Sequence, residues 1–311
     1  MPNICRLVAP HGEGVREPLV SSAVALRRRQ REHWDGVARK MPDLFGAAST
    51  RYYQRCEIAL IQRGFGALHG KRVLKLDLWN EAVNTRILQW MQSQGADVFG
   101  LDISGVTTLR AYHNASSSSR SMHVVQGDIR SLPFEDNALD FVYTMGTIEH
   151  VDEYQTAVHE IHRVLKRGGK AIIGVPHKWD IFLRPLFVQA LDLFDRYPYS
   201  PERSFSCGEL RGVLEEAGFS VTSRTGLLAS PAIIRMADCF FYRRNIPLRH
   251  LSPLFLWPFS FLEPRFPWLG RFGYLLAMIV EKGRAVGHGG AGNGSGKLRQ
   301  LNRPRQAPAV S

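Results

Sequence analysis

The sequence lacks a long run of apolar residues and has few cysteines. Its most apolar region, residues 251–280, is interrupted by four prolines and three charged side chains, whereas a membrane-spanning helix needs about 20 mostly apolar residues. The four cysteines (Cys5, Cys56, Cys207 and Cys239) form no CxxC pair, so neither a metal site nor a disulfide framework is indicated. No secretory signal pattern opens the chain. We therefore expect a cytoplasmic globular protein without a metal.

Acidic side chains are scarce at both ends of the chain. The net charge is +12, but residues 1–40 hold eight Lys or Arg against four acids, and residues 282–311 hold six against none. Residues 41–281 therefore carry only +2. The basic ends are either solvated or able to contact an anionic membrane or RNA. The nearly neutral centre gives little support to a nucleic-acid enzyme.

Strand-like apolar segments alternate with helical patterns between residues 72 and 224. This alternation predicts an α/β fold with a doubly wound, mostly parallel sheet. Strands are expected at 72–76, 98–103, 124–126, 141–145, 170–175, 219–224 and 273–280, and helices at 47–68, 85–94, 152–166 and 210–217. We expect a basic, weakly ordered segment over 1–46, one Rossmann-like domain over 47–282 with an N-terminal helical cap, and a disordered, basic, glycine-rich tail over 283–311.

The most informative stretch is 124–151, which reads VVQGDIRSLPFEDNALDFVYTMGTIEHV. It combines two strand candidates, an acidic turn between them and the sequence Glu-His-Val directly after the second. In wording and order it resembles the class I methyltransferases that use S-adenosylmethionine, in particular the small-molecule type 11 group. The resemblance covers about residues 48–282 and implies a last strand that runs antiparallel to the others.

The resemblance implies residues for the nucleoside half of S-adenosylmethionine. Asp102 stands at the end of the second strand, where a carboxylate suits the ribose hydroxyls. Asp128 suits the adenine amino group, and Ile129 offers an apolar face to the ring. The remaining cofactor-binding candidates are Ile103, Gly127, Thr144 and Gly146.

The turn after the first strand lacks the glycines that the family usually has there. Residues 73–82 read VLKLDLWNEA, although glycine is what normally lets the backbone approach a ligand. Two explanations remain open. Side chains of Asp77, Asn80 or Glu81 bind the ammonium group of the methionine moiety, or cofactor binding has been lost and the fold serves as a binding or scaffold protein.

Histidines supply the catalytic candidate. His150 follows the fourth strand, near the expected position of the methyl group, and its ordinary pKa suits a general base. The alternative is that Glu149 and His150 cap the following helix or shape the pocket, and we interpret Glu149 as structural. His159 and His162 have a metal-pair spacing without a third ligand, so we expect surface histidines.

Eight of the 32 aromatic residues fall within residues 251–274. We predict an aromatic insert at about 240–272 that either packs on the sheet, forms a lid over an apolar acceptor, or rests on a membrane interface. A hydrophobic, lipid-like small-molecule acceptor methylated on oxygen or nitrogen is the preferred interpretation, with peripheral membrane contact through 251–274. A cofactor-free scaffold is second. A nucleic-acid or protein methyltransferase is third, because residues 144–147 lack the Pro-Pro-aromatic run typical of enzymes that methylate exocyclic amines and no cysteine follows a proline.

Overall fold

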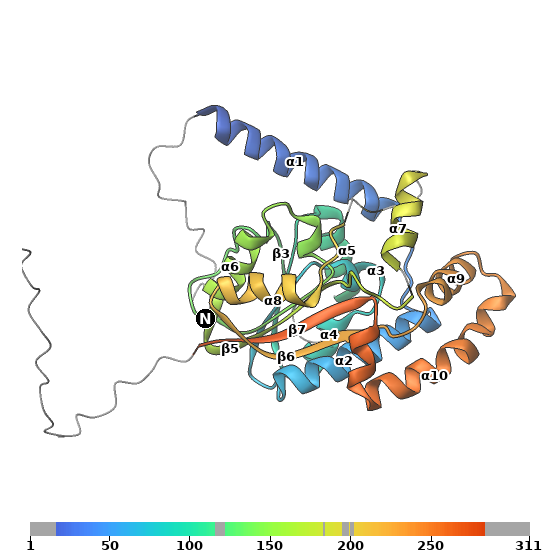
Figure 1. Ribbon diagram of the computed structural model, residues 1–311. Helices are drawn as coiled ribbons and strands as arrows, with labels where there is room; N and C mark the ends of the chain where they lie inside the picture. The colour runs from blue at the N-terminus through green and yellow to red at the C-terminus, as the bar shows by residue number, and fades with distance from the viewer. Residues whose placement is uncertain (1–16, 116–121, 183, 195–198, 200–201, 284–311) are drawn as a thin grey trace, which may run out of the picture.

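The computed structural model describes residues 17–115, 122–182, 184–194, 199 and 202–283 (Figure 1). Its centre is a seven-stranded sheet in the order β3-β2-β1-β4-β5-β7-β6. The strands are β1 Arg72–Leu76, β2 Asp97–Asp102, β3 His123–Gln126, β4 Leu139–Met145, β5 Leu165–Pro176, β6 Phe219–Leu227 and β7 Leu275–Lys282. The first five run parallel, and β7 pairs antiparallel with both β5 and β6. The predicted fold, including its antiparallel strand, is confirmed.

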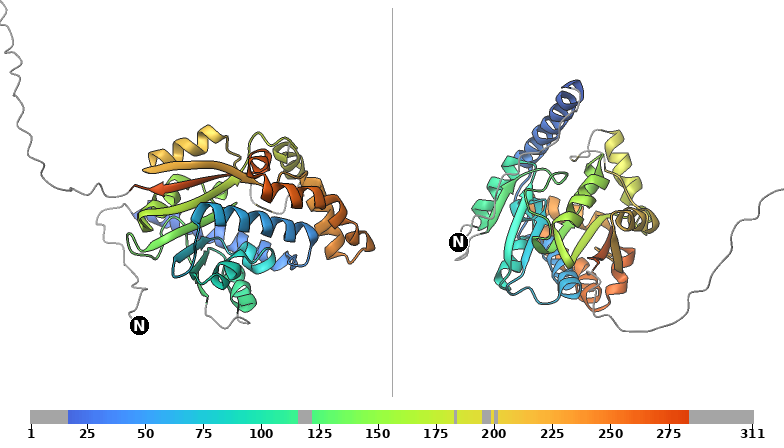
Figure 2. Two further views of the ribbon diagram at one scale, coloured as in Figure 1. Left: turned by 90° about the horizontal axis from the view of Figure 1, so that it is seen from below. Right: turned by 90° about the vertical axis from the view of Figure 1, so that its left-hand side faces the viewer.

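Helices cover both faces of the sheet (Figure 2). The helices are α1 Glu17–Lys40, α2 Ala48–Phe65, α3 Trp79–Val83, α4 Ile87–Ser93, α5 Gly105–Ala115, α6 Tyr154–Val164, α7 Arg184–Leu193, α8 Cys207–Glu216, α9 Ala232–Arg243 and α10 Ser252–Arg265. Three short 3-10 helices are η1 Ile148–His150, η2 Pro247–His250 and η3 Pro267–Phe272. The aromatic insert is thus helical, formed by α9, η2, α10 and η3.

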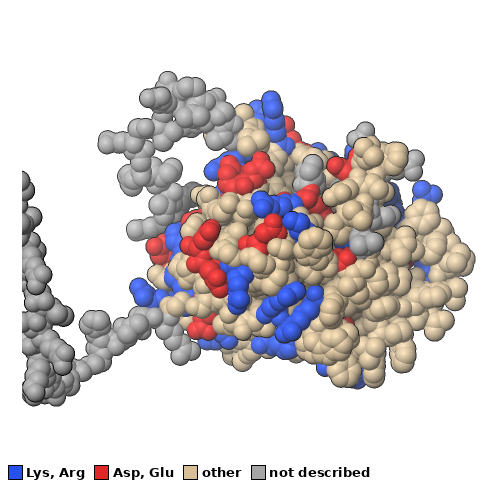
Figure 3. Space-filling model, viewed as in Figure 1, with Lys and Arg blue, Asp and Glu red and all other residues tan. Residues whose placement is uncertain are grey.

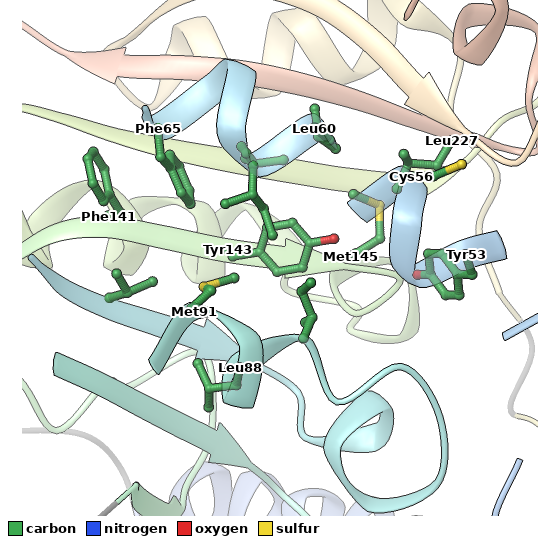
Figure 4. Packing of buried hydrophobic residues seen from close by; sticks show 14 of the residues in the cluster. Tyr53, Cys56, Leu60, Phe65, Leu88, Met91, Phe141, Tyr143, Met145 and Leu227 are labelled. Atoms are coloured by element: carbon green, nitrogen blue, oxygen red, sulfur yellow. The ribbon is translucent and has the colours of Figure 1, made fainter. Parts of the chain in front are cut away.

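Alternating side chains along the strands divide the core into two clusters, because successive residues of a strand point to opposite faces. Val73, Phe141 and Tyr143 face α2 and α4, whereas Leu74 and Val142 face α6 and α8. Figure 4 shows Tyr143 between residues of α2 and α4, with Phe65 stacked on Phe141 at a centroid distance of 4.4 Å. Buried on both sides, the strands hold their carboxyl ends in fixed positions.

The N-terminal segment corrects one expectation. Residues 17–40 form the 24-residue helix α1, where we expected weak order. The reason is composition: residues 19–35 contain neither proline nor glycine, and alanine, leucine and arginine are among the best helix formers. Arg28 and Glu32 add an ion pair one turn apart on its exposed face. Residues 1–16 and 284–311, including the rest of the predicted tail, lie outside the described residues.

Several element boundaries also differ from the expected ones. The helix expected over 152–166 ends at Val164, and β5 begins at Leu165 rather than after Gly169. The helices α1, α3, α5, α7, α9 and α10 were not predicted. The helix α8 begins with a capping box, since Ser206 accepts from the Glu209 amide while the Glu209 side chain accepts from the Ser206 amide. No helix among the described residues is long and apolar enough to cross a membrane.

Candidate functional site

A cavity of about 730 Å³ opens at the carboxyl ends of β1, β2 and β4, where ligands of open α/β sheets bind. It brings together most of the predicted site residues: Asp77, Asn80, Asp102, Ile103, Asp128, Ile129, Gly146 and His150. Glu81, Gly127 and Thr144 do not line it. Gly127 is closed off by Leu101, because a Cβ there would lie 2.8 Å from Leu101 Cδ1. Thr144 is fully buried within the sheet.

In the turn after β1, Asp77 and Leu78 allow the chain to turn and pack closely without a glycine. Asp77 itself adopts a left-handed backbone conformation with φ of 66°, which Asp tolerates better than most residues. The next residue, Leu78, is fully buried and packs against Gly100 of β2, where a Cβ would collide with Leu78 Cδ2. The glycine that allows close packing therefore stands in the neighbouring strand.

The Asp77 side chain is held at the edge of the cavity from three directions. Its Oδ2 accepts from Thr147 Oγ1 at 3.0 Å, and its Oδ1 accepts from the Trp79 amide at 3.0 Å. Lys75 Nζ lies 3.4 Å from Oδ1. Burial raises the pKa of this carboxyl, while Lys75 and these hydrogen bonds oppose the rise. Asp77 is thus a fixed acceptor in the first turn.

Lys75 is fully buried in β1 and explains why Glu81 misses the cavity. Its Nζ lies 3.1 Å from Glu81 Oε2, and Glu81 Oε1 accepts from the Leu88 amide at 2.8 Å. The Glu81 side chain therefore lies in the protein interior. This position does not agree with our prediction that Glu81 binds the ammonium group of the methionine moiety. Asn80 does line the cavity, but its amide nitrogen donates to Glu57 and its oxygen accepts from Asn84.

Asp102 lies at the end of β2, as predicted. Its Oδ2 accepts from the Leu78 amide at 2.8 Å and its Oδ1 from the Ser104 amide at 2.7 Å. Burial raises the pKa of Asp102 to about 7, although both amides lower it. A carboxylate has about four lone-pair positions, so each oxygen can still accept a ligand hydroxyl.

Asp128 is bound by a residue that we did not predict. Arg130 donates to both its oxygens, with NH2 to Oδ2 at 2.7 Å and Nε to Oδ1 at 2.9 Å. Arg130 also reaches Glu153 at 2.6 Å. Burial alone would raise the pKa of Asp128. The hydrogen bonds from Arg130 lower the pKa by more than burial raises it, so the pKa lies below its ordinary value. The carboxylate lines the cavity with much of its accepting capacity already used.

The helix α1 lies above the sheet in Figure 1, and its residues Gln30 and Trp34 line the cavity. Gln30 donates to the His150 carbonyl at 3.0 Å and accepts from Arg130, and Trp34 meets the His150 ring edge-on at 5.0 Å. Asp35 accepts from Ser104 Oγ at 2.6 Å, next to Asp102. These contacts cannot be predicted from the local sequence, because they join residues about 70 to 120 positions apart.

His150 and Glu149 follow β4 and both line the cavity. His150 Nε2 lies 3.9 Å from Glu149 Oε1, and the histidine side chain is 12% exposed. Burial raises the pKa of Glu149 well above its usual value, and Glu149 Oε2 has no hydrogen-bond partner among the described residues. The two histidines with metal-pair spacing lie on α6, where His159 is exposed and His162 is half-buried. Among the described residues, no cluster of His, Cys, Asp or Glu side chains could hold a metal ion.

Comparison with known proteins agrees with the fold. Residues 82–173 match a family model described as a methyltransferase domain. A demethylmenaquinone methyltransferase of Staphylococcus epidermidis is 30% identical over an alignment of 155 positions, which covers 43% of this chain and 63% of the relative. Residues 82–173 therefore resemble a methyltransferase domain of the class I, type 11 kind. The family model and this relative are both described as methyltransferases.

Other similarities are weaker. The 24-methylenesterol C-methyltransferase 2 of Oryza sativa subsp. japonica is 26% identical over 53% of this chain and 47% of its own length. An S-adenosylmethionine-dependent methyltransferase from Mesorhizobium loti has a TM-score of 0.50 at 15% identity, covering 73% of this chain and 98% of the other. The [4+2]-cyclase SpnF has a TM-score of 0.52 at 16% identity, covering 74% and 81%. The last two show the fold alone. The chain thus spans about three fifths or less of its curated relatives.

Proposed function

We propose that this protein binds S-adenosylmethionine in the cavity and methylates an oxygen or nitrogen atom of a small, hydrophobic acceptor. The observation that carries the proposal is the convergence of Asp77 and Asp102 on one cavity, at the ends of the adjacent strands β1 and β2. Asp102 suits the ribose hydroxyls, and Asp77 suits the ammonium group. Ile103 and Ile129 provide apolar surface beside them for the adenine.

The cofactor supplies an electrophilic methyl group, so the protein has to orient the acceptor and remove its proton. His150 is the proposed base, since it lines the same cavity and Glu149 lies beside it. Gln30 and Trp34 form a roof of the cavity beside His150, which Gln30 and Trp34 both contact.

Transfer of a labelled methyl group tests this function. With methyl-labelled S-adenosylmethionine and a total lipid extract, the wild type is expected to move label into the organic phase. His150→Gln should lower the initial rate by about 10²-fold or more, the usual contribution of a general base, while calorimetry shows unchanged binding of S-adenosylhomocysteine. Absence of binding to either nucleoside by the wild type would instead favour the second candidate, a binding protein on this fold. The engagement of Asp128 by Arg130 favours that candidate.

The acceptor is proposed to be hydrophobic because of the apolar patch, defined as the exposed apolar residues of α9, α10 and η3. It includes Leu254, Phe255 and Trp257, which are 71%, 59% and 64% exposed. Figure 3 shows a broad uncharged surface where α9 and α10 lie. The relatives that are a demethylmenaquinone and a sterol methyltransferase are consistent with such an acceptor.

The charges around the apolar patch support peripheral contact with an anionic membrane through residues 251–274. Residues 229–273 contain only two acids, Asp238 and Glu263, and both are buried. Arg243, Arg244 and Arg265 are exposed. Apolar side chains rimmed by cations are what an anionic interface attracts.

Flotation with vesicles tests the membrane contact. Binding is expected to vesicles that contain phosphatidylserine and to weaken by about tenfold or more in Leu254→Ser/Trp257→Ser, because two exposed apolar side chains no longer leave water. Trp179→Ser is the matched control, since Trp179 is 71% exposed outside the patch. Equal flotation of the two variants would contradict the contact.

A further inference from the structure

The part of the cavity that α9 lines contains a cation, the guanidinium of Arg235, without a carboxylate partner among the described residues. Arg235 lines the cavity, and its NH1 and NH2 donate to the neutral oxygens Ser49 Oγ at 3.3 Å and Asn84 Oδ1 at 3.2 Å. Its guanidinium carbon lies 5.4 Å from the centre of the Tyr53 ring. Among the described residues, no carboxylate lies within ion-pair distance of Arg235.

The acids nearby are engaged elsewhere. Asp238, one turn along α9, is 1% exposed, and its Oδ2 accepts from the Ser49 amide at 2.7 Å. Glu202 accepts two hydrogen bonds from Arg184, so this arginine of the cavity is already neutralised. A third arginine that lines the cavity, Arg243, is exposed at the end of α9. A partly buried cation that only neutral groups contact has lost hydration without gaining an opposite charge, and an anionic ligand would supply that charge.

Between Arg235 and Arg243, the residues of α9 that line the cavity are Met236, Cys239 and Phe240, and this part of the wall is apolar. Tyr199 and Tyr274 also line the cavity, and Met236 and Phe240 follow on α9 at the mouth. Met236 is 41% exposed and Phe240 50% exposed, so both belong to the cavity and to the apolar patch. A molecule in this half of the cavity would therefore meet a cation inside and an apolar path toward the surface.

We infer that the methyl acceptor is an amphipathic acid, whose anionic carboxylate or phenolate binds Arg235 and whose apolar tail runs along Met236 and Phe240 to the patch. Arg235 then acts as a specificity residue, because it distinguishes an anionic headgroup from a neutral one on the same tail. This inference rests on the proposed function, since it concerns the acceptor half of the same cavity.

Calorimetry with three probes of equal tail length tests the inference. They are para-octylbenzoate, an octyl-substituted nitrophenol that is ionised at neutral pH, and para-octylbenzyl alcohol, which is neutral. Each is titrated into the full chain with and without S-adenosylhomocysteine. Hydrogen bonds to a charged group should make at least one anion bind about tenfold to a hundredfold more tightly than the alcohol. The two anions separate a carboxylate acceptor from a phenolate.

Variants of α9 assign the preference to one side chain. Arg235→Gln is expected to bind the anions only as weakly as the alcohol, with alcohol affinity unchanged, and Arg235→Lys should recover part of the preference. Arg244→Gln is the matched control, because Arg244 is exposed and does not line the cavity. A preference that survives Arg235→Gln, or equal affinities of the wild type for all three probes, overturns the inference. If Arg235→Gln does not fold, the wild-type comparison and Arg235→Lys decide. Binding of S-adenosylhomocysteine alone reports separately on the proposed function.

Discussion

Replacing Asp102 with alanine is expected to weaken binding of S-adenosylmethionine by about a hundredfold. The carboxylate is proposed to accept the ribose hydroxyls, and a hydrogen bond to a charged group contributes about 1.5–3 kcal/mol. Calorimetry on the purified chain measures the change. Asp97→Ala is the control, because Asp97 begins the same strand, is exposed and lies at the opposite end from the cavity. An affinity of Asp102→Ala within twofold of the wild type would remove Asp102 from the site.

Titration with pH separates this role from a merely structural one. Burial raises the pKa of Asp102 to about 7. Ribose hydroxyls donate to the ionised form, so binding favours loss of the proton, and affinity should rise as the pH increases from about 6 to 8 and then level off. Asp102 also orders the turn through the amides of Leu78 and Ser104, so the variant could lose affinity for that reason alone. Only a ligand-binding carboxylate predicts that the pH dependence disappears as well.

The sheet and the ends of its strands were predictable because they depend on short-range pattern. Short apolar runs identify β1, β2 and β4, and parallel strands in one sheet bring their carboxyl ends to one edge. Asp77, Asp102 and Asp128 therefore meet at one cavity, as expected. What each carboxylate does there depends on contacts that no spacing encodes.

Three features of the site lie beyond local pattern. Arg130 turns back on Asp128 only because the short bridge between Asp128 and Ser131 folds the chain there. The roof residue Gln30 reaches His150 across 120 positions. The missing glycine of the first turn is matched by Gly100, but only the packing of Leu78 against it shows the connection. A turn without glycine can thus pack closely when the neighbouring strand supplies the glycine. A motif read along the sequence does not show this, because the two residues are far apart in the chain.

Lys75 carries the second large expected effect, and this one concerns stability. Burial lowers the pKa of Lys75, but the carboxylates of Asp77, Glu81 and Glu57 raise it more, so the side chain stays charged in the interior. Lys75→Met should reduce the free energy of unfolding by about 3–5 kcal/mol, the usual cost of leaving one partner of a buried ion pair behind. Urea unfolding measures the difference. Lys71→Met is the control, because Lys71 is exposed just before β1 and its loss should change stability by less than about 0.5 kcal/mol.

A second substitution distinguishes the lost charge from lost packing. Glu81 is fully buried beside Lys75, and its Oε1 accepts from the Leu88 amide. In Lys75→Met/Glu81→Gln the amide oxygen can still accept from Leu88, while the unpaired carboxylate is gone. The double variant should therefore be more stable than Lys75→Met alone. Its loss of unfolding free energy should be smaller than the sum of the losses in Lys75→Met and Glu81→Gln, by a coupling energy of about 1–3 kcal/mol. If the two losses simply add, the pair does not stabilise the first turn, and the support that fixes Asp77 at the cavity must come from Thr147 and the Trp79 amide instead.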